Sequence, residues 1–309
     1  MKTIISRMYN IKYHMMRYSL FFLICINLIW SSFSYEYLLF PKDARSLALS
    51  NSASAYNRTV LLNNPAALSK TGEKRVYSFI LLPADIQSGE FQVITEKFKG
   101  VLANKLSILN YGTIVDSETK NPTSAYDVLI ASGYKKEVFD IISLGFSSTF
   151  MHSSIAGFNS NILLCNIGMR GQLLNNNAGF GVSVENIPFI ISSYANIKER
   201  ISKNIRWSIF YSPKYIPLVI NTDFLLSNIS NNIEIYNGLE FIFSDILTLR
   251  LGISNRGKYS IKETSYSHFI KSASFGAGFS FTKYNLDIGF MNLGPAGYIT
   301  GLTIKNKLN

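Results

Sequence analysis

Few side chains in this sequence have the types and spacing that catalysis needs. Beyond residue 34 it contains two histidines, His152 and His268. A serine hydrolase needs its nucleophile and a histidine within hydrogen-bond reach, yet the chain has no G-x-S-x-G segment. His152 falls at the end of an expected strand and His268 in a long polar segment, where solvated histidines are expected. We therefore predict that the chain is not an enzyme.

Metal, cofactor and nucleic-acid binding are also not predicted. There is no group of cysteines and histidines with metal-ligand spacing and no glycine-rich phosphate loop, so we expect no cofactor. Cys165 is the only cysteine after residue 34 and is expected on the apolar face of its strand. The net charge is +11, but the basic residues are scattered. Without a dense basic run or stripe, nucleic-acid binding has no support.

Two groups of polar residues remain as candidates for a functional site. A tight turn at Asp245 brings Glu240 and Arg250 almost opposite each other on neighbouring strands. We interpret them as a charge pair that orders a polar interior, in preference to a selectivity filter. The second group is Asn63, Asn64, Pro65 and Ala66. Pro65 can begin a helical turn, because its missing N–H costs nothing there, and Asn63 or Asn64 can cap it.

The elements that must position these residues are strands. Apolar residues alternate with small or polar ones, as in the segment 275–281, where Phe275, Ala277, Phe279 and Phe281 share one face. Successive strand side chains point to opposite faces, so each strand has one apolar and one polar face. Most of the segments are about ten residues long, which suits a tilted membrane-crossing strand. The expected strands are 76–82, 90–98, 101–111, 124–135, 139–151, 161–171, 177–186, 204–212, 215–226, 235–244, 246–254, 272–283, 284–292 and 297–305.

Residues 1–34 have the pattern of a signal peptide. A basic region precedes the apolar stretch 20–30, and Ser32 and Ser34 suit a cleavage site. An uncleaved anchor is the alternative, but this stretch is short for a membrane span. The rest of the chain contains no run of eighteen apolar residues, although the sequence is 47% hydrophobic. An exported chain of two-faced strands predicts an all-β fold, a closed antiparallel barrel of about fourteen strands in the outer membrane.

This barrel, residues 73–309, is expected to have both ends on the periplasmic side and long outer loops at 112–123, 187–203 and 255–271. Segments 76–82 and 101–111 are apolar on both faces, which predicts that something packs against them inside the lumen. The predicted inward residues are Arg250, Gly278 and Asp287. The predicted lipid-facing residues are Leu249, Leu251, Phe279, Phe281, Leu286 and Ile288.

Residues 35–72 do not follow the strand pattern. Asp43 can cap a short helix in the small-residue segment that follows it, and the turn at Pro65 comes next. Two short helices before a barrel predict an N-terminal hatch within the lumen. A plain surface loop is the alternative.

The segment Ala44-Arg-Ser-Leu-Ala-Leu49, followed by Asn63-Asn-Pro-Ala-Ala-Leu68, resembles the PorV/PorQ family of outer-membrane proteins, which is similar to the FadL-type transporters of hydrophobic compounds. Shorter matches, such as Leu249-Arg-Leu-Gly252, extend the resemblance from about residue 36 to 305. It implies a barrel whose inward-folded hatch contains Asn64, Pro65 and Ala66 in a turn.

The resemblance implies a role in type IX secretion. Such a component would bind exported proteins or other secretion proteins at the cell surface, with the loops 187–203 and 255–271 as contact surfaces. The alternative is passive transport of hydrophobic small molecules through a hatch that moves. Both functions place the chain among outer-membrane lipids, and they differ in whether protein partners copurify and whether the lumen holds an apolar pocket.

Overall fold

The computed structural model describes residues 35–56, 60, 61, 63–70, 72, 74–115, 122–194, 199–228, 233–256 and 272–307. The expected signal peptide, residues 1–34, lies outside these residues, and so does most of the expected loop 255–271. No helix in the described ranges is long and apolar enough to cross a membrane.

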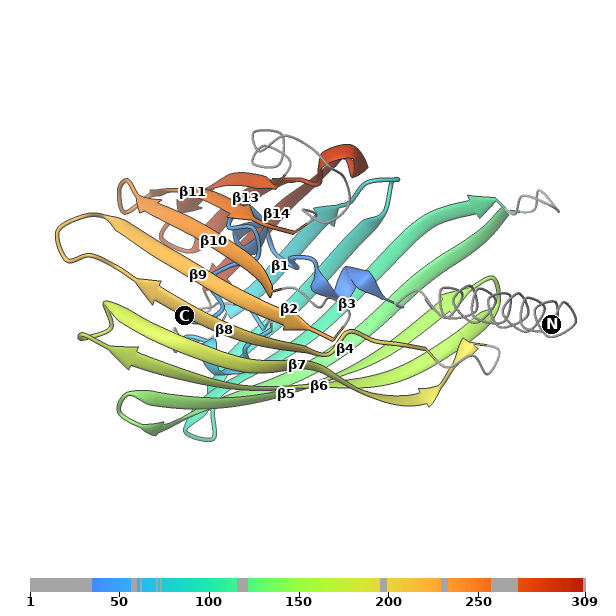
Figure 1. Cartoon of the computed structure of the whole chain (residues 1–309), viewed down its shortest axis with the longest axis horizontal. Helices are drawn as coiled ribbons and strands as arrows, with labels where there is room; N and C mark the ends of the chain where they lie inside the picture. Colours follow the sequence, from blue (N-terminus) through green and yellow to red (C-terminus); the bar gives the residue numbers. More distant parts are fainter. Residues whose placement is uncertain are drawn as a thin grey trace, which may run out of the picture. The chain divides into compact units, whose positions relative to one another are not determined.

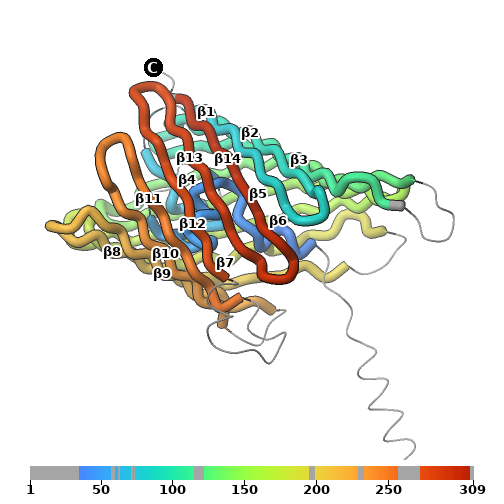
Figure 2. The backbone as a smooth tube through the Cα atoms, turned by 90° about the horizontal axis from the view of Figure 1, so that it is seen from above, coloured from blue at the N-terminus to red at the C-terminus, as the bar shows by residue number. Residues whose placement is uncertain are grey.

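The strands form a closed antiparallel barrel in which neighbours in sequence are neighbours in space (Figure 1, Figure 2). β1 pairs with β14, from Lys74 opposite Lys307 to Leu81 opposite Thr300, and this pairing closes the ring. The fourteen-stranded all-β barrel predicted from the sequence is confirmed. The strands of the described residues are β1 (Lys74–Leu81), β2 (Gln87–Lys97), β3 (Gly100–Val115), β4 (Pro122–Phe139), β5 (Ile142–Ile155), β6 (Phe158–Leu173), β7 (Ala178–Ser192), β8 (Asn204–Tyr211), β9 (Leu218–Ser227), β10 (Ile233–Ile242), β11 (Leu247–Ser254), β12 (Ala273–Ser280), β13 (Tyr284–Asn292) and β14 (Tyr298–Lys307).

The two ends of the barrel differ in their connections. The turn end carries short connections, among them 98–99 between β2 and β3 and 140–141 between β4 and β5. Lys74 and Lys307, which begin the first strand and end the last one, also lie at this end. The loop end carries the longer connections, such as 193–203 and 255–272. This asymmetry fits the predicted orientation, in which the turn end faces the periplasm.

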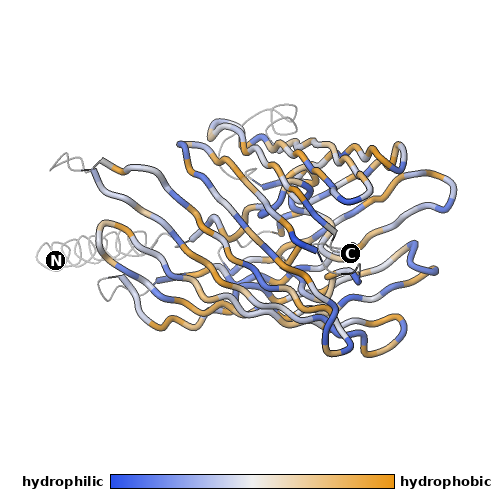
Figure 3. The backbone as a smooth tube through the Cα atoms, turned by 180° about the vertical axis from the view of Figure 1, so that it is seen from behind, coloured by the Kyte–Doolittle hydropathy of each residue, from blue (hydrophilic) through white to orange (hydrophobic). Residues whose placement is uncertain are grey.

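Hydrophobic and hydrophilic residues alternate along the strands (Figure 3). The strands place apolar residues outside and polar residues inside, as this alternation predicts. Leu249, Leu251 and Phe281 are exposed on the outer face, whereas Arg250 and Asp287 are buried on the inner face. The predicted register of this part of the barrel is confirmed. Because the outer belt is apolar around many strands, its natural surroundings are lipid.

Two of the expected loops are shorter than predicted. β3 continues to Val115 and β4 begins at Pro122, with a bulge after Asn110. β7 runs on to Ser192, although the sequence pattern predicts an end before Pro188. Beyond Glu185 this strand pairs only with β6. Pro188 therefore lies where β7 has one unpaired edge, a position that proline tolerates.

Within its described residues, the hatch (residues 35–72) contains three short helical segments: η1 (Glu36–Leu39), α2 (Ala44–Ala48) and η2 (Pro65–Ala67). Asp43 caps α2 as predicted, since its Oδ1 accepts hydrogen bonds from the Arg45 and Ser46 amides at 3.0 and 3.1 Å. The helix ends after five residues, where Ser50 and Asn51 take positive φ angles. η1 was not predicted from the sequence. The hatch lies inside the ring of strands (Figure 1).

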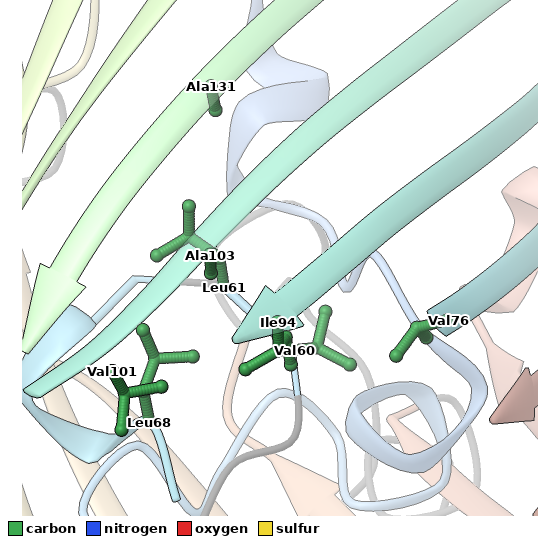
Figure 4. Packing of buried hydrophobic residues seen from close by; sticks show 8 residues of the cluster. All are labelled: Val60, Leu61, Leu68, Val76, Ile94, Val101, Ala103 and Ala131. Carbon is green, nitrogen blue, oxygen red and sulfur yellow. The ribbon is translucent and has the colours of Figure 1, made fainter. Parts of the chain in front are cut away.

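The hatch also explains the strands that are apolar on both faces. Val60, Leu61 and Leu68 of the hatch pack against inner-face residues of β1–β4 (Figure 4). The wall side of this cluster consists of Val76, Ile94, Val101, Ala103 and Ala131. Inward aliphatic residues are thus buried against the hatch and not left facing a polar lumen. The prediction that something packs inside at segments 76–82 and 101–111 is confirmed.

Candidate functional site

The first half of the hatch rests on a row of glycines. Gly238, Gly252, Gly276, Gly289 and Gly301 lie on the inner face of five consecutive strands, β10–β14, and several are directly paired across strands. A Cβ atom on Gly289 would overlap the Ala44 carbonyl group of α2. Without side chains there, the helix backbone contacts the barrel wall itself. We call this row the α2 seat.

Hydrogen bonds fix both ends of α2 in this seat. The Ala44 amide, one of the free N–H groups at the start of the helix, donates to Thr303 Oγ1 at 2.9 Å. Ser274 Oγ donates to the Ala48 carbonyl at the other end, at 3.0 Å. Unpaired N–H and C=O groups at a buried helix end would destabilise the fold. Thr303 and Ser274 supply partners for one such group at each end of this five-residue helix.

Arg45 connects α2 to a buried network of charges. Its guanidinium forms a fork with Glu240, with Nε–Oε2 and Nη2–Oε1 distances of 2.9 and 2.5 Å. Glu240 also accepts from Arg250 Nε at 3.0 Å. Arg250 Nη1 reaches Asp287 at 2.8 Å, and Lys305 lies 2.8 Å from the same carboxylate. Cations and anions therefore alternate from the hatch across β10, β11, β13 and β14.

The electrostatic balance holds Arg45 in its charged form. Burial alone would lower the pKa of the Arg45 guanidinium, but the Glu240 carboxylate beside it outweighs burial and raises the pKa. The network borders a cavity of about 210 Å³ that lies toward the turn end. Its lining includes Arg45, Glu240, Arg250, Asp287 and Lys305, so any solute in this cavity meets a strongly polar surface.

Glu240 and Arg250, the two residues expected to form a charge pair, are direct cross-strand partners, and they belong to this larger network. Sequence reasoning missed that Arg45 bridges the hatch to the pair. It also missed Asp287 and Lys305 as members, although Asp287 was expected to point inward. Glu240 and Arg250 were predictable because the tight turn at Asp245 fixes the register of their hairpin. The contacts that cross β12 or come from the hatch depend on closure of the whole ring, which the sequence does not indicate.

The second half of the hatch rests on another set of glycines. Gly145, Gly168 and Gly181, on β5, β6 and β7, lie under the turn formed by Asn64 and η2. A Cβ atom on Gly145 would overlap the backbone of Pro65 and Ala66. We call these glycines the η2 seat. α2 and η2 therefore lie against different groups of strands, mainly β11–β14 and β4–β6.

The four residues singled out in this turn have different roles. Asn64 Oδ1 accepts from the Ala66 amide at 3.0 Å, and its Nδ2 donates to the Met169 carbonyl of β6 at 3.2 Å. Pro65 takes the first helical position and Ala66 is fully buried. Asn63 is only half-buried. Asn64 therefore both caps the turn and donates a hydrogen bond that holds it to the wall.

Replacing Asn64 with leucine should loosen the hatch but leave the barrel intact. Leucine is similar in size but leaves the Ala66 amide and the Met169 carbonyl without their side-chain partner, at a cost of about 1–3 kcal/mol. We expect faster proteolysis between residues 40 and 70 and an unchanged heat-dependent shift of the barrel on a gel. Asn63→Leu is the matched control. Equal proteolysis of the wild type and Asn64→Leu would show that the cap does not hold the hatch.

Between the two seats a second buried arginine ties the hatch to the wall. Arg206 of β8 donates to Glu185 at 2.8 Å, lies 3.4 Å from Asp223 and donates to the Asn51 carbonyl at 3.2 Å. Asp223 in turn accepts from the Ala53 and Ser54 amides, each at 3.1 Å. Asp223 therefore satisfies hatch amides that no helix or sheet pairs. This arginine was not predicted, since nothing along the sequence links β8 to residue 51.

The start of the hatch meets a group of tyrosines and acids on β3, on β4 and after β7. Tyr111 donates to Asp127 at 2.7 Å, and Tyr35 donates to Glu199 at 3.1 Å. Tyr37 packs edge-on against both Tyr35 and Tyr111. Burial raises the pKa of the Tyr35 phenol, so it stays protonated and can donate to Glu199. None of these residues forms a catalytic arrangement with His152, whose ring contacts Asn161.

Neither a protein-family model nor a curated protein matches the chain in sequence. Solved structures match it in fold. The CymD monoaromatic hydrocarbon channel superposes with a TM-score of 0.64 at 11% identity, covering 90% of this chain and 99% of the channel. The toluene transporter TodX of Pseudomonas putida gives a TM-score of 0.60 at 11% identity, covering 86% and 98%.

A FadL homologue of Pseudomonas aeruginosa also matches, with a TM-score of 0.53 at 10% identity and coverage of 87% and 99%. These neighbours are described as channels, transporters or FadL relatives, not as enzymes. Identities this low establish the fold alone. The chain has the fold of FadL-like outer-membrane hydrocarbon channels, and this fold with its apolar outer belt indicates a location in the bacterial outer membrane.

Proposed function

We propose that the chain is a passive channel for small hydrophobic molecules in the outer membrane. One observation carries the proposal: the lumen is occupied by a hatch whose contact with β1–β4 is aliphatic, through Val60, Leu61 and Leu68. A solute that passes along this contact exchanges water for hydrocarbon. Such a path favours apolar molecules and penalises polar ones, which would lose their hydrogen bonds with water. The channels and transporters of aromatic hydrocarbons that share the fold support the same function.

Uptake measurements test this function. In cells that lack their own channel of this fold, expression of the full chain should increase the uptake rate of labelled toluene and leave that of a sugar unchanged. Leu61→Asn places an amide in the aliphatic contact and should slow toluene uptake, while Leu249→Asn on the outer face is the control. Toluene uptake equal to that of cells with an empty vector would contradict the proposal.

A second candidate function is that of a PorV/PorQ-type component of type IX secretion, which binds exported proteins at the surface. The order of two sequence motifs favours it, one containing Arg45 and the other Asn64. Both motifs lie at the hatch seats, so the resemblance concerns how a hatch is held and is compatible with either function. Copurification in mild detergent distinguishes them: secretion or cargo proteins should be recovered with the chain only if this second function holds.

A further inference from the structure

A second cavity lies on the loop-end side of the hatch. It measures about 240 Å³ and lies between the hatch and the loop ends of β10, β11 and β13. Its apolar lining includes Phe40 and Pro41 of the hatch, Met291 of β13, and Leu293 and Ala296 of the turn that follows. Small-molecule sites are usually larger than this, so the cavity suits a compact molecule about the size of one ring.

One cation faces this apolar lining. Arg256, which follows β11, borders the cavity, and its guanidinium lies 4.5 Å from the centre of the Phe40 ring. Its hydrogen bond to the hatch is long, 3.5 Å from Nη1 to the Leu39 carbonyl. A guanidinium has five N–H donors, and stacking on an aromatic ring leaves its edges available.

Arg256 differs in its ion pairing from the arginines of the charge networks. Arg45, Arg206 and Arg250 each form ion pairs with glutamate or aspartate. Within the parts of the chain that the structure describes, Arg256 forms no ion pair with a carboxylate. Polar residues, among them Asn51, Ser254 and Asn292, also line the cavity. A half-buried guanidinium there, with donors to spare, matches the planar two-oxygen geometry of a carboxylate.

We propose that this cavity binds compact aromatic monocarboxylates and that Arg256 determines this specificity. The carboxylate accepts two hydrogen bonds from the guanidinium, and the ring occupies the space beside Pro41, Met291 and Leu293. A neutral hydrocarbon would leave the guanidinium unpaired and desolvated, which disfavours it here. The inference rests on the proposed channel function, because it adds a loop-end binding site for aromatic solutes with one carboxylate to a channel that also passes neutral hydrocarbons.

Binding of benzoate and of benzamide, its uncharged counterpart of the same shape, tests the inference on the purified full-length mature chain in detergent. By equilibrium dialysis, the wild type should bind benzoate roughly 10- to 100-fold more tightly than benzamide, as expected for charge-assisted hydrogen bonds. Arg256→Gln should abolish this preference, and Arg256→Lys, which keeps the charge but not the fork, should retain part of it. Arg200→Gln, at an exposed arginine outside the cavity lining, should bind like the wild type.

Equal binding of benzoate and benzamide by the wild type would overturn the inference, and so would undiminished benzoate preference in Arg256→Gln. If Arg256→Gln does not fold, the comparison of benzoate and benzamide binding by the wild type still tests the inference. Toluene uptake separates the two proposals. Toluene uptake without benzoate preference refutes only the cavity's specificity, whereas absence of toluene uptake refutes the channel function itself.

Discussion

Replacing Glu240 with alanine is expected to destabilise the protein by about 3–5 kcal/mol, because it leaves two buried cations without their shared anion. Arg45 and Arg250 both pair with this carboxylate, and both side chains are largely buried. We expect the midpoint of urea unfolding in detergent, followed through Trp207 fluorescence, to fall strongly. The hatch should also become accessible to trypsin at Arg45.

The exposed ion pair between Lys70 and Glu137, with an Nζ–Oε2 distance of 2.5 Å, offers a matched control. Surface pairs contribute about 0–1 kcal/mol, so Lys70→Ala, which leaves Glu137 paired with the buried Lys135, should leave the unfolding midpoint almost unchanged. The double variant Arg45→Ala with Glu240→Ala should lose less than the sum of the two single losses, because the side chains interact directly. Equal effects of Glu240→Ala and Lys70→Ala would mean that the buried network does not stabilise the fold.

Replacing Gly289 with leucine should displace the first half of the hatch from its seat. The new side chain would occupy the position of the Ala44 backbone, which cannot rotate away as a side chain can. Overpacking of a filled interior costs about 1–3 kcal/mol where the surrounding structure can shift to make room. Here the structure can make room only if α2 moves away from the wall. We expect trypsin cleavage at Arg45 and a higher permeability of reconstituted vesicles to small solutes.

Gly89→Leu is the control for this experiment. Gly89 also lies in a strand, but a Cβ atom there meets no atom within 4 Å, and its neighbours on the outer face are apolar residues such as Phe79 and Ile108. The leucine should therefore face lipid, and the hatch should stay protected. If the hatch resists trypsin equally well in Gly289→Leu and Gly89→Leu, α2 is not tightly packed against its seat.

The barrel follows from local rules, which is why the sequence predicts it well. A two-residue alternation sets which side chains face inward, and a tight turn sets the register of a hairpin, so the sequence alone is enough to place Arg250 opposite Glu240. The predicted end of β7 before Pro188 was wrong, because proline is compatible with a strand that has one unpaired edge.

Contacts within the lumen do not follow from such rules. Arg45 and Glu240 are 195 residues apart, and their pairing depends on the closure of the ring and on the path of the hatch across it. In the sequence, the seat glycines stand out only as small residues on the polar faces of their strands. Nothing along the chain indicates that Gly289 contacts a helix or that Gly145 contacts a turn.

The position of the hatch has a consequence for the order of assembly. Residues 60–68 contact strands from the first half of the barrel, β1–β6, whereas α2 contacts mainly β11–β14. During synthesis and export, the partners of the later hatch residues therefore become available first, although α2 precedes them in the chain. The site for α2 is complete only when the last strand has arrived, and that strand also joins β1 to close the ring. Docking of the helix and closure of the wall should thus be one late step, so that a chain truncated before β14 would leave its N-terminal helix undocked.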